Sequence, residues 1–354
     1  MAAAIDNPNR RKLLSPNTWT AAGLHLATVR TASMPGPVAE LRVARRAMAC
    51  DFSVTFPGGA DTAIEAGCAA LDEIERLEEK LSVYRDDSDL SRLNRSAAGS
   101  PIRVDAELYH ILRTAARLAI ESGGAFDAAA GALVKAWGFF RGPKRVPSAD
   151  ELAAALAATG SHHAAFNDDQ RTVAFDRPGV EFNLGSIGKG FAIDRALHCM
   201  QSRFAIRCAL LQGGQSSLRA IGTQPGGTKG WLVAIGDPCC AGKTLARVRL
   251  HHRALGTSGA ANQFFVHQGR RYGHVLDPRR GWPAAGLLCA SAVARTAAEA
   301  DALSTAFFVL GIDETRRYCQ RHSGAGAVLV APPEEAGGTP RVVLVGAVDA
   351  EVTI

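Results

Sequence analysis

Apolar residues recur at helical spacing along several stretches of the chain. In DTAIEAGCAALDEIERLEEKLSVY, residues 61–84, they fall three or four residues apart, at Ile64, Cys68, Leu71, Ile74, Leu77 and Leu81. This spacing places side chains on one face of an α-helix and predicts an amphipathic helix. Similar patterns predict helices over residues 104–124, where a glycine pair ends the segment, and around residues 188–203 and 299–321.

A different pattern, alternation, predicts strands. Phe52, Val54 and Phe56 alternate with polar residues before Pro57-Gly58-Gly59, which predicts a strand and its turn. In the second half, short apolar runs predict further strands: TVAFD, CALLQGG, GWLVAIGD, ARVRL, GAVLVA and RVVLVG. Residues 141–170 predict an insert with one short helix near SADELAAALAATG. Strands and helices in mixed order predict an α+β fold, with mixed β-sheets and packed helices.

The first 40 residues carry no such pattern. NRRKLLSPNTWTAAGLHLATVR has twin arginines before a mildly apolar stretch, as export signals do, but it is interrupted by Pro16, Asn17, Trp19 and His25. We expect residues 1–40 to be a poorly ordered or weakly signal-like extension, and residues 41–354 to form one domain of two intimate lobes. No run approaches the roughly 18 apolar residues of a membrane span, so no stable span is expected.

Composition narrows the class of partner. The 354 residues are 47% hydrophobic and 21% charged, as in a globular protein with an ample core. The net charge is +6, but the basic residues are scattered and only 6% of residues are aromatic. We therefore expect no nucleic-acid partner, and the charge suits anionic small molecules or a solvated surface. Eight cysteines without CxxC spacing predict mostly reduced core residues.

Two glycine-rich stretches invite a phosphate-binding interpretation. GDPCCAGKT fails as a P-loop, because five residues separate its glycines where the motif needs four, and a strand follows it. NLGSIGKGFAIDRAL is better, since its glycines permit close approach of backbone to a ligand and Lys189 adds a cation where a helix begins. A tight strand-to-helix turn with an exposed lysine explains this second stretch equally well.

Two further segments carry oxygen and nitrogen ligands. In EADALSTAFFVLG, residues 299–311, Asp301 and Thr305 are four residues apart, so a helix points both oxygens into the same space. Alternatively, Asp301 caps the helix and Thr305 bonds back to a carbonyl. In HVLDPRRGWP, His274 lies three residues from Asp277 beside a basic pair, which suits phosphoryl chemistry, although an exposed loop histidine is the simpler interpretation.

Taken in order, several segments resemble the signature blocks of the FAD:protein FMN transferases, the ApbE family: MACDF, LSVYRDDSDLSRLN, GGAFDAAAGALVKAWGF, FNLGSIGKGFAIDRA, LLQGGQSS, TSG, GHVLDPRRGWP and ADALSTAFFVLG. The resemblance covers about residues 42–347. It implies an ApbE-like, T-fold-related α+β enzyme that binds FAD with Mg²⁺. Such an enzyme splits the diphosphate and moves FMN onto a threonine or serine of a target protein, releasing AMP. Some members instead hydrolyse FAD to FMN and AMP.

The resemblance also implies roles for individual residues. Asp301, Thr305 and the main-chain carbonyl at Gly188 would bind Mg²⁺, and His274 would be the general base for the acceptor hydroxyl. Asp277 is a second catalytic candidate, or equally a turn residue before Pro278. FAD contacts carry over to Met48, Tyr84, Ala125, Phe126, Asp127, Asn183, Lys189 and Val275, of which Met48 and Phe126 could instead be ordinary core residues.

Some residues depart from the family pattern. Asn183 stands where the family commonly has Asp, Ser186 and Gly188 replace a usual Gly and Ala, and Gln215 stands where an acidic residue is common. A FAD pyrophosphatase or a non-catalytic FAD-binding protein therefore stays an alternative. The family usually works in the cell envelope, whereas the N-terminus and the cysteines slightly favour the cytoplasm.

Overall fold

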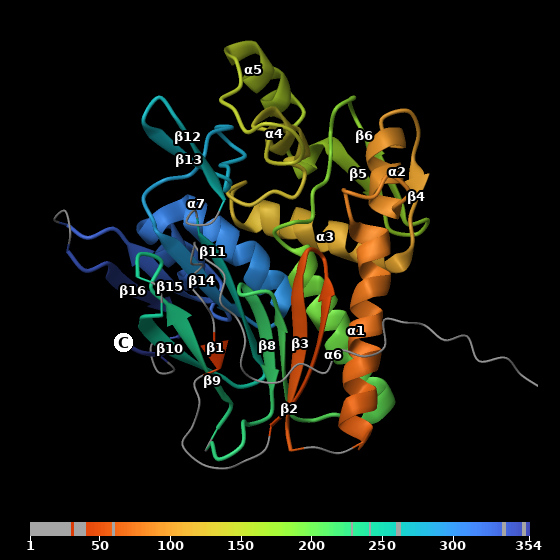
Figure 1. The fold of residues 1–354 in the computed structure, drawn as a ribbon. Helices are drawn as coiled ribbons and strands as arrows, with labels where there is room; N and C mark the ends of the chain where they lie inside the picture. The colour runs from red at the N-terminus through yellow and green to blue at the C-terminus, as the bar shows by residue number, and fades with distance from the viewer. Residues whose placement is uncertain are drawn as a thin grey trace, which may run out of the picture.

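The computed structural model describes residues 30–31, 40–58, 61–227, 229–240, 242–259, 263–334, 338–348 and 352–354. Within these ranges strands and helices occur in mixed order and pack in layers (Figure 1). The expected α+β fold is therefore confirmed.

An eight-stranded sheet is the centre of the molecule. Its strand order is β16-β15-β14-β11-β8-β7-β3-β2, and every neighbouring pair is antiparallel. The strands are β2 (Glu40–Ala47), β3 (Cys50–Pro57), β7 (Ala209–Gly213), β8 (Ser217–Ile221), β11 (Arg253–Gly259), β14 (Cys289–Ala294), β15 (Gly326–Ala331) and β16 (Arg341–Gly346).

This sheet is covered on both faces. Successive side chains of a strand point to opposite faces, and accordingly Leu211 and Ala254 join one hydrophobic cluster while Leu210 and Leu255 join another. Against the first face pack α1 (Asp61–Leu81), α6 (Gly188–Phe204) and α7 (Ala297–Arg321). Against the second packs a sheet of order β1-β9-β10-β17, formed by β1 (Arg30–Thr31), β9 (Trp231–Gly236), β10 (Thr244–Leu250) and β17 (Val352–Thr353).

A group of shorter elements gathers at one end of the molecule, at the top of Figure 1. It contains α2 (Asp89–Ser96), α4 (Gly131–Ala136), α5 (Ala149–Ala157), η1 (Ser161–His163), the sheet β4 (Ile102–Arg103), β6 (Thr172–Phe175) and β5 (Ala164–Asn167), and the hairpin of β12 (Phe264–His267) and β13 (Arg270–Gly273). Helix α3 (Ala106–Glu121) connects this end to α7. Trp137 and Tyr272 anchor a separate small core there.

Most predicted elements are present, with informative exceptions. The strand predicted at residues 52–56 is one arm of a hairpin, β2–β3, which turns at Met48 (φ +47°) and Ala49 (φ +60°). Two successive positive φ values suit a two-residue hairpin turn, but Gly and Asn usually supply them. No strand was predicted around the TSG segment, but its residues 257–259 lie at the end of β11. Ile64, counted in the apolar stripe of α1, is 46% exposed.

Three other expectations concern the N-terminal extension, membrane spans and the cysteines. Except for β1 and Glu40, the first residue of β2, the N-terminal extension lies outside the described residues. None of the helices in the described ranges is long and apolar enough to cross a membrane. The eight cysteines are all free, as expected, but only Cys289 and Cys319 are fully buried, while Cys239 and Cys240 are exposed.

Candidate functional site

The junction of α6, α7 and β11 is unusually close. A Cβ atom added at Gly190 would lie 2.0 Å from the carbonyl oxygen of Ala297, and one at Gly256 would lie 2.3 Å from that of Ala300. Because no larger residue fits at either point, α7 lies with its backbone against both α6 and β11. This contact fixes where the side chains of the first turns of α7 point.

Asp301 lies at this junction and is only 5% exposed. Its Oδ2 accepts a 2.7 Å hydrogen bond from the backbone N–H of Gly190, and the hydroxyl of Ser217 bonds the same carboxylate. Burial raises the pKa of Asp301 to about 6, although Lys189 lowers it through space. The structure thus holds a buried carboxylate whose negative charge is incompletely balanced.

The simpler interpretation of Asp301 and Thr305 is wrong. Helix α7 begins at Ala297, and Thr296 caps it by accepting from the N–H of Glu299 at 3.2 Å. Asp301 therefore does not cap its own helix and meets the first turn of α6 instead. The hydroxyl partner of Thr305 is Ser258 at 3.0 Å, rather than a carbonyl of its own helix.

A second carboxylate lies close to the first and is bound differently. Asp194 of α6 accepts the N–H groups of Ala297 and Ala298, both at 2.9 Å, and pairs with Arg219. Each helix thus holds the start of the other, since Asp301 accepts an N–H from the first turn of α6. Negative groups at helix N-termini stabilise the free N–H groups found there.

The glycine-rich stretch forms the start of α6, as predicted. Gly188 is its first residue, and a Cβ there would meet Leu184 at an ordinary 3.6 Å, so alanine fits at this position. Lys189 follows and influences the pKa of Asp301, His274 and Cys50 through space. The structure therefore brings Lys189 near both Asp301 and His274. GDPCCAGKT, in contrast, joins antiparallel β9 and β10, so its rejection as a P-loop is confirmed.

His274 directly follows β13, and its ring is oriented by one backbone group. Its Nδ1 lies 3.1 Å from the carbonyl oxygen of Gln263, which also accepts the backbone N–H of His274 at 3.0 Å. Because a carbonyl can only accept, Nδ1 carries the proton and Nε2 is left with a lone pair. Burial, together with Lys189 and Lys144, lowers the pKa of His274 below its ordinary value. A neutral imidazole is the form that accepts a proton.

Asp277 is engaged within its own turn. Arg279 donates to its carboxylate from Nε and Nη2, both at 2.8 Å, and from its backbone N–H at 3.0 Å. The carbonyl of Asp277 also accepts the N–H of Gly281 at 2.8 Å. These contacts suit the turn-residue interpretation of Asp277, whose carboxylate shapes the loop that follows His274.

The residues expected to contact FAD fall into two groups. Tyr84 is 57% exposed and stacks on Phe140 with ring centroids 4.9 Å apart, and the half-buried Met48 forms the β2–β3 turn. In contrast, buried positions are taken by Ala125, Phe126 and Val275. Tyr84 therefore offers an accessible aromatic face, whereas the other three side chains are buried in the interior of the protein.

Asp127 links two segments of the chain through its carboxylate. Its carboxylate accepts the N–H groups of Ala129 and Ser161, both at 2.8 Å, and the hydroxyl of Ser161 at 2.5 Å. Two segments that are more than thirty residues apart in the chain are tied together by one side chain. The carboxylate of Asp127, like that of Asp277, therefore bonds other groups of the protein in this structure.

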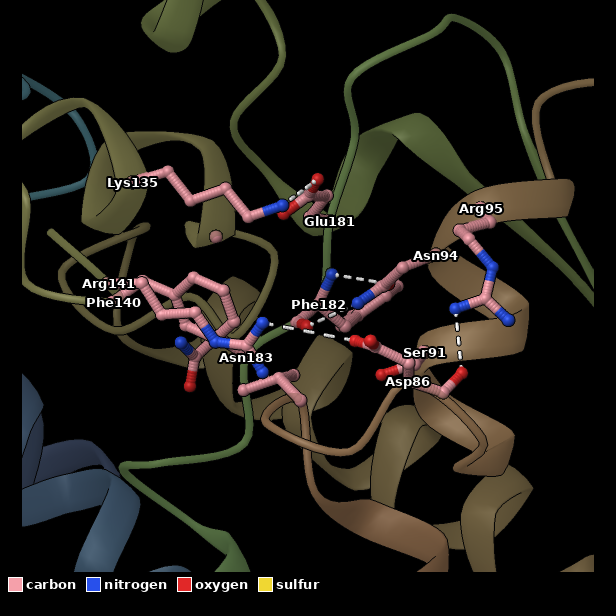
Figure 2. A pocket seen from close by; sticks show the side chains of 12 residues that line it. Asp86, Ser91, Asn94, Arg95, Lys135, Phe140, Arg141, Glu181, Phe182 and Asn183 are labelled. Carbon is pink, nitrogen blue, oxygen red and sulfur yellow. Dashed lines mark hydrogen bonds and ion pairs between the residues drawn. The ribbon is translucent and has the colours of Figure 1, made fainter.

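Asn183 shapes the glycine-rich loop without needing a charge. Its Oδ1 accepts the N–H of Gly185 at 2.9 Å, a bond that an aspartate at this position could equally accept. Asn183 also lines a pocket of about 310 Å³ between α2 and the segment that follows α4 (Figure 2). The amide side chain therefore preserves the loop bond despite the departure from the family pattern.

The polar groups of this pocket mostly bind one another, as the dashed lines in Figure 2 show. Lys135 pairs with Glu181 at 2.5 Å, and Asn94 both donates to and accepts from the backbone of Phe182 at 2.9 Å. Arg95 donates to the carbonyl of Asp86 at 2.8 Å. The lining of the pocket, which includes Phe140 of the Tyr84–Phe140 stack, is thus held in place by contacts within the protein.

Sequence reasoning missed four residues of the junction: Asp194, Ser217, Ser258 and Ser304. All four lie within the quoted segments: Asp194 is in FNLGSIGKGFAIDRA, Ser217 is in LLQGGQSS, and the serines Ser258 and Ser304 are in TSG and ADALSTAFFVLG. No local spacing connects these two serines, because they meet only when α7 packs on β11.

Comparisons with known proteins identify relatives of this chain. The model of the ApbE family matches residues 48–329. A FAD:protein FMN transferase of Treponema pallidum is 33% identical over 301 residues, covering 78% of this chain and 80% of that protein. One of Haemophilus influenzae is 31% identical, covering 71% and 74%. The crystal structure of an ApbE protein from Thermotoga maritima matches with a TM-score of 0.77 and 30% identity, covering 86% and 97%.

Proposed function

Since the chain belongs to the ApbE family, we propose that it catalyses Mg²⁺-dependent transfer of FMN from FAD to a threonine or serine hydroxyl of a target protein. AMP is the other product. The observation that supports this function best is the buried, incompletely balanced carboxylate of Asp301 beside Thr305, Lys189 and the start of α6.

The donor set fits a magnesium ion. Mg²⁺ prefers hard oxygen ligands, keeps several waters and commonly binds through one or two carboxylates together with substrate phosphate. Asp301, the Thr305 hydroxyl and the carbonyl of Gly188 would hold it. No group of three or more His, Cys, Asp or Glu side chains that could hold a metal occurs in the described ranges, so a thiolate or histidine site is not the alternative there. When bound, the ion would neutralise negative charge on the diphosphate.

The groups of this chain supply the remaining steps. Lys189 attracts the diphosphate to the start of α6 by its positive charge. Nε2 of His274 accepts the proton of the acceptor hydroxyl as that oxygen attacks the phosphorus of the FMN half. A new oxygen–phosphorus bond forms, the bond from that phosphorus to the bridging oxygen breaks, and AMP leaves with the bridging oxygen.

The test follows the fate of FAD. Purified protein is incubated with FAD and Mg²⁺, or with chelator, in the presence of a threonine-containing acceptor peptide or the same peptide with valine in its place. We expect AMP release that requires Mg²⁺, covalent flavin on the threonine peptide only, and loss of both in Asp301→Ala. Release of AMP and free FMN, without covalent flavin on a peptide that is known to accept it, would instead establish a pyrophosphatase.

A further inference from the structure

Three hydroxyl groups form a connected chain beside Asp301. Ser258 of β11 lies 3.0 Å from the hydroxyl of Thr305 and 2.8 Å from that of Ser304, oxygen to oxygen. Ser304 in turn donates to the backbone carbonyl of Asp301 at 2.8 Å. The chain therefore begins at one proposed metal ligand and ends on the backbone of the other.

The direction of this chain follows from counting protons. A carbonyl oxygen only accepts, so the single hydroxyl proton of Ser304 is used on Asp301. Ser304 must then accept from Ser258, whose single proton is thereby used as well. Ser258 must accept from Thr305. Each hydroxyl thus has its proton committed, and the proton of Thr305 points to Ser258.

We propose that Ser258 and Ser304 are positioning residues that turn the hydroxyl of Thr305 into a metal ligand. With its proton directed to Ser258, Thr305 presents only lone pairs to the space it shares with Asp301, as a cation requires. Partners that fix the orientation of ligand groups in this way commonly contribute 10-fold to 100-fold to metal affinity. The inference rests on the proposed function, because it takes Thr305 to be a ligand.

The surroundings provide a matched control. Thr257, the neighbour of Ser258 in β11, bonds Ser291 of β14 through buried hydroxyls 2.8 Å apart. Adjacent residues of a strand point to opposite faces, so this pair lies on the far side of the sheet. Ser291→Ala removes a buried hydroxyl of the same kind without touching the chain that ends on Asp301.

The experiment measures binding of Mn²⁺ alone, by the loss of its free electron paramagnetic resonance signal, in wild type and variants with melting temperatures checked. We expect Ser258→Ala to raise the Kd about 10-fold or more, Ser304→Ala to raise it less, and Ser291→Ala to leave it unchanged. In Thr305→Val, which itself binds more weakly, adding Ser258→Ala should raise the Kd no further. Ser304→Ala tests the same chain if Ser258→Ala folds poorly, because alanine favours a helix.

Three results would overturn the proposal. An unchanged Kd in folded Ser258→Ala and Ser304→Ala, or additive effects of Ser258→Ala and Thr305→Val, would show that the hydroxyl chain does not orient a ligand. Either result, obtained while wild type still transfers FMN, leaves the proposed function intact. Failure of wild type to bind Mn²⁺, together with failure to release AMP from FAD, would refute both.

Discussion

Asp194 and Asp301 are two buried carboxylates on neighbouring helices, and each accepts N–H groups from the first turn of the other's helix. Asp194 is also paired with Arg219, which supplies a full positive charge in contact with its oxygen. Asp301 receives one N–H, one hydroxyl and only the distant field of Lys189. The two groups are therefore both held by N–H groups of the neighbouring helix, and burial raises the pKa of both, but Asp194, whose side chain is 16% exposed, has a counter-ion in contact.

We infer that this difference separates a structural carboxylate from one that serves the proposed function. A buried charge is stable when it is paired, and removing one partner of a buried pair is costly. A buried charge without a contacting counter-ion is costly from the start, unless something that is not part of the chain completes it. Asp194 belongs to the first kind, and Asp301 to the second, as a metal ligand should.

The largest effect that this comparison predicts is the loss of transfer in Asp301→Asn. The amide keeps an oxygen to accept the N–H of Gly190 but brings no charge to a cation. We expect FMN transfer to fall roughly 1,000-fold, about 4 kcal/mol of transition-state stabilisation, while the circular dichroism spectrum is unchanged. Near-normal FMN transfer by this variant would show that the charge of Asp301 is not needed for the reaction.

Asp194→Asn should have the opposite signature. The change leaves Arg219 without its partner and weakens the hold on the start of α7, so we expect the free energy of unfolding in urea to fall by about 3 kcal/mol. The Kd for Mn²⁺ should stay within about threefold of wild type, because Asp194 is not a ligand. A variant of unchanged stability that has lost the metal would reverse the assignment of the two residues.

The third prediction concerns pH in the presence of chelator. The pKa of Asp301 is raised to about 6, so the folded protein binds this proton more tightly than the unfolded chain does. The contribution of Asp301 to stability is then fully present below about pH 4 and is lost as the pH rises through 6. Compared with Asp301→Asn, wild type should lose on the order of 2 kcal/mol between pH 4 and 7.5.

Unfolding of both proteins in urea at several pH values measures this difference. Saturating Mg²⁺ serves as the control, since binding to the folded state alone should restore the stability that wild type loses. A pH profile identical in wild type and Asp301→Asn would mean that the carboxylate of Asp301 is already neutralised within the chain.

The smallest effect is expected from Gly188→Ala. A Cβ at this position has room, so both the melting temperature and the Kd for Mn²⁺ should stay close to wild type, the latter within about twofold. Thermal unfolding and the Mn²⁺ titration suffice. A tenfold weaker Kd would show that the carbonyl at Gly188 needs the freedom of glycine, and that the site differs from its alanine-containing relatives.

Sequence alone predicted what depends on local spacing. The periodicity of α1, α6 and α7 predicted those helices, while the shared space expected for the oxygens of Asp301 and Thr305 stays a prediction. The β2–β3 turn escaped because Met48 and Ala49 carry no turn signal, unlike Gly or Asn. Strand β11 was not predicted, because glycine is uncommon in strands, yet the close approach of α7 requires a glycine at position 256.

Contacts made across the fold could not be predicted in this way. Ser258 and Ser304 are separated by 46 residues, and Asp194 and Ala297 by 103. Their residue types are common in solvent-exposed loops and helices, so nothing local marks them. Resemblance to a family predicts the metal ligands, while the serines that contact Thr305 became visible only in the structure.

The hydrogen bonds by which Asp194 and Asp301 join α6 and α7 also determine when the site forms during folding. Gly190 and Asp301 are 111 residues apart, so their bond closes a long loop and is expected late in folding. During synthesis, Gly190 is made long before Asp301, so a growing chain contains no pair of the proposed ligands until residue 301 has been added. The proposed metal site would therefore form only after most of the domain has been synthesised.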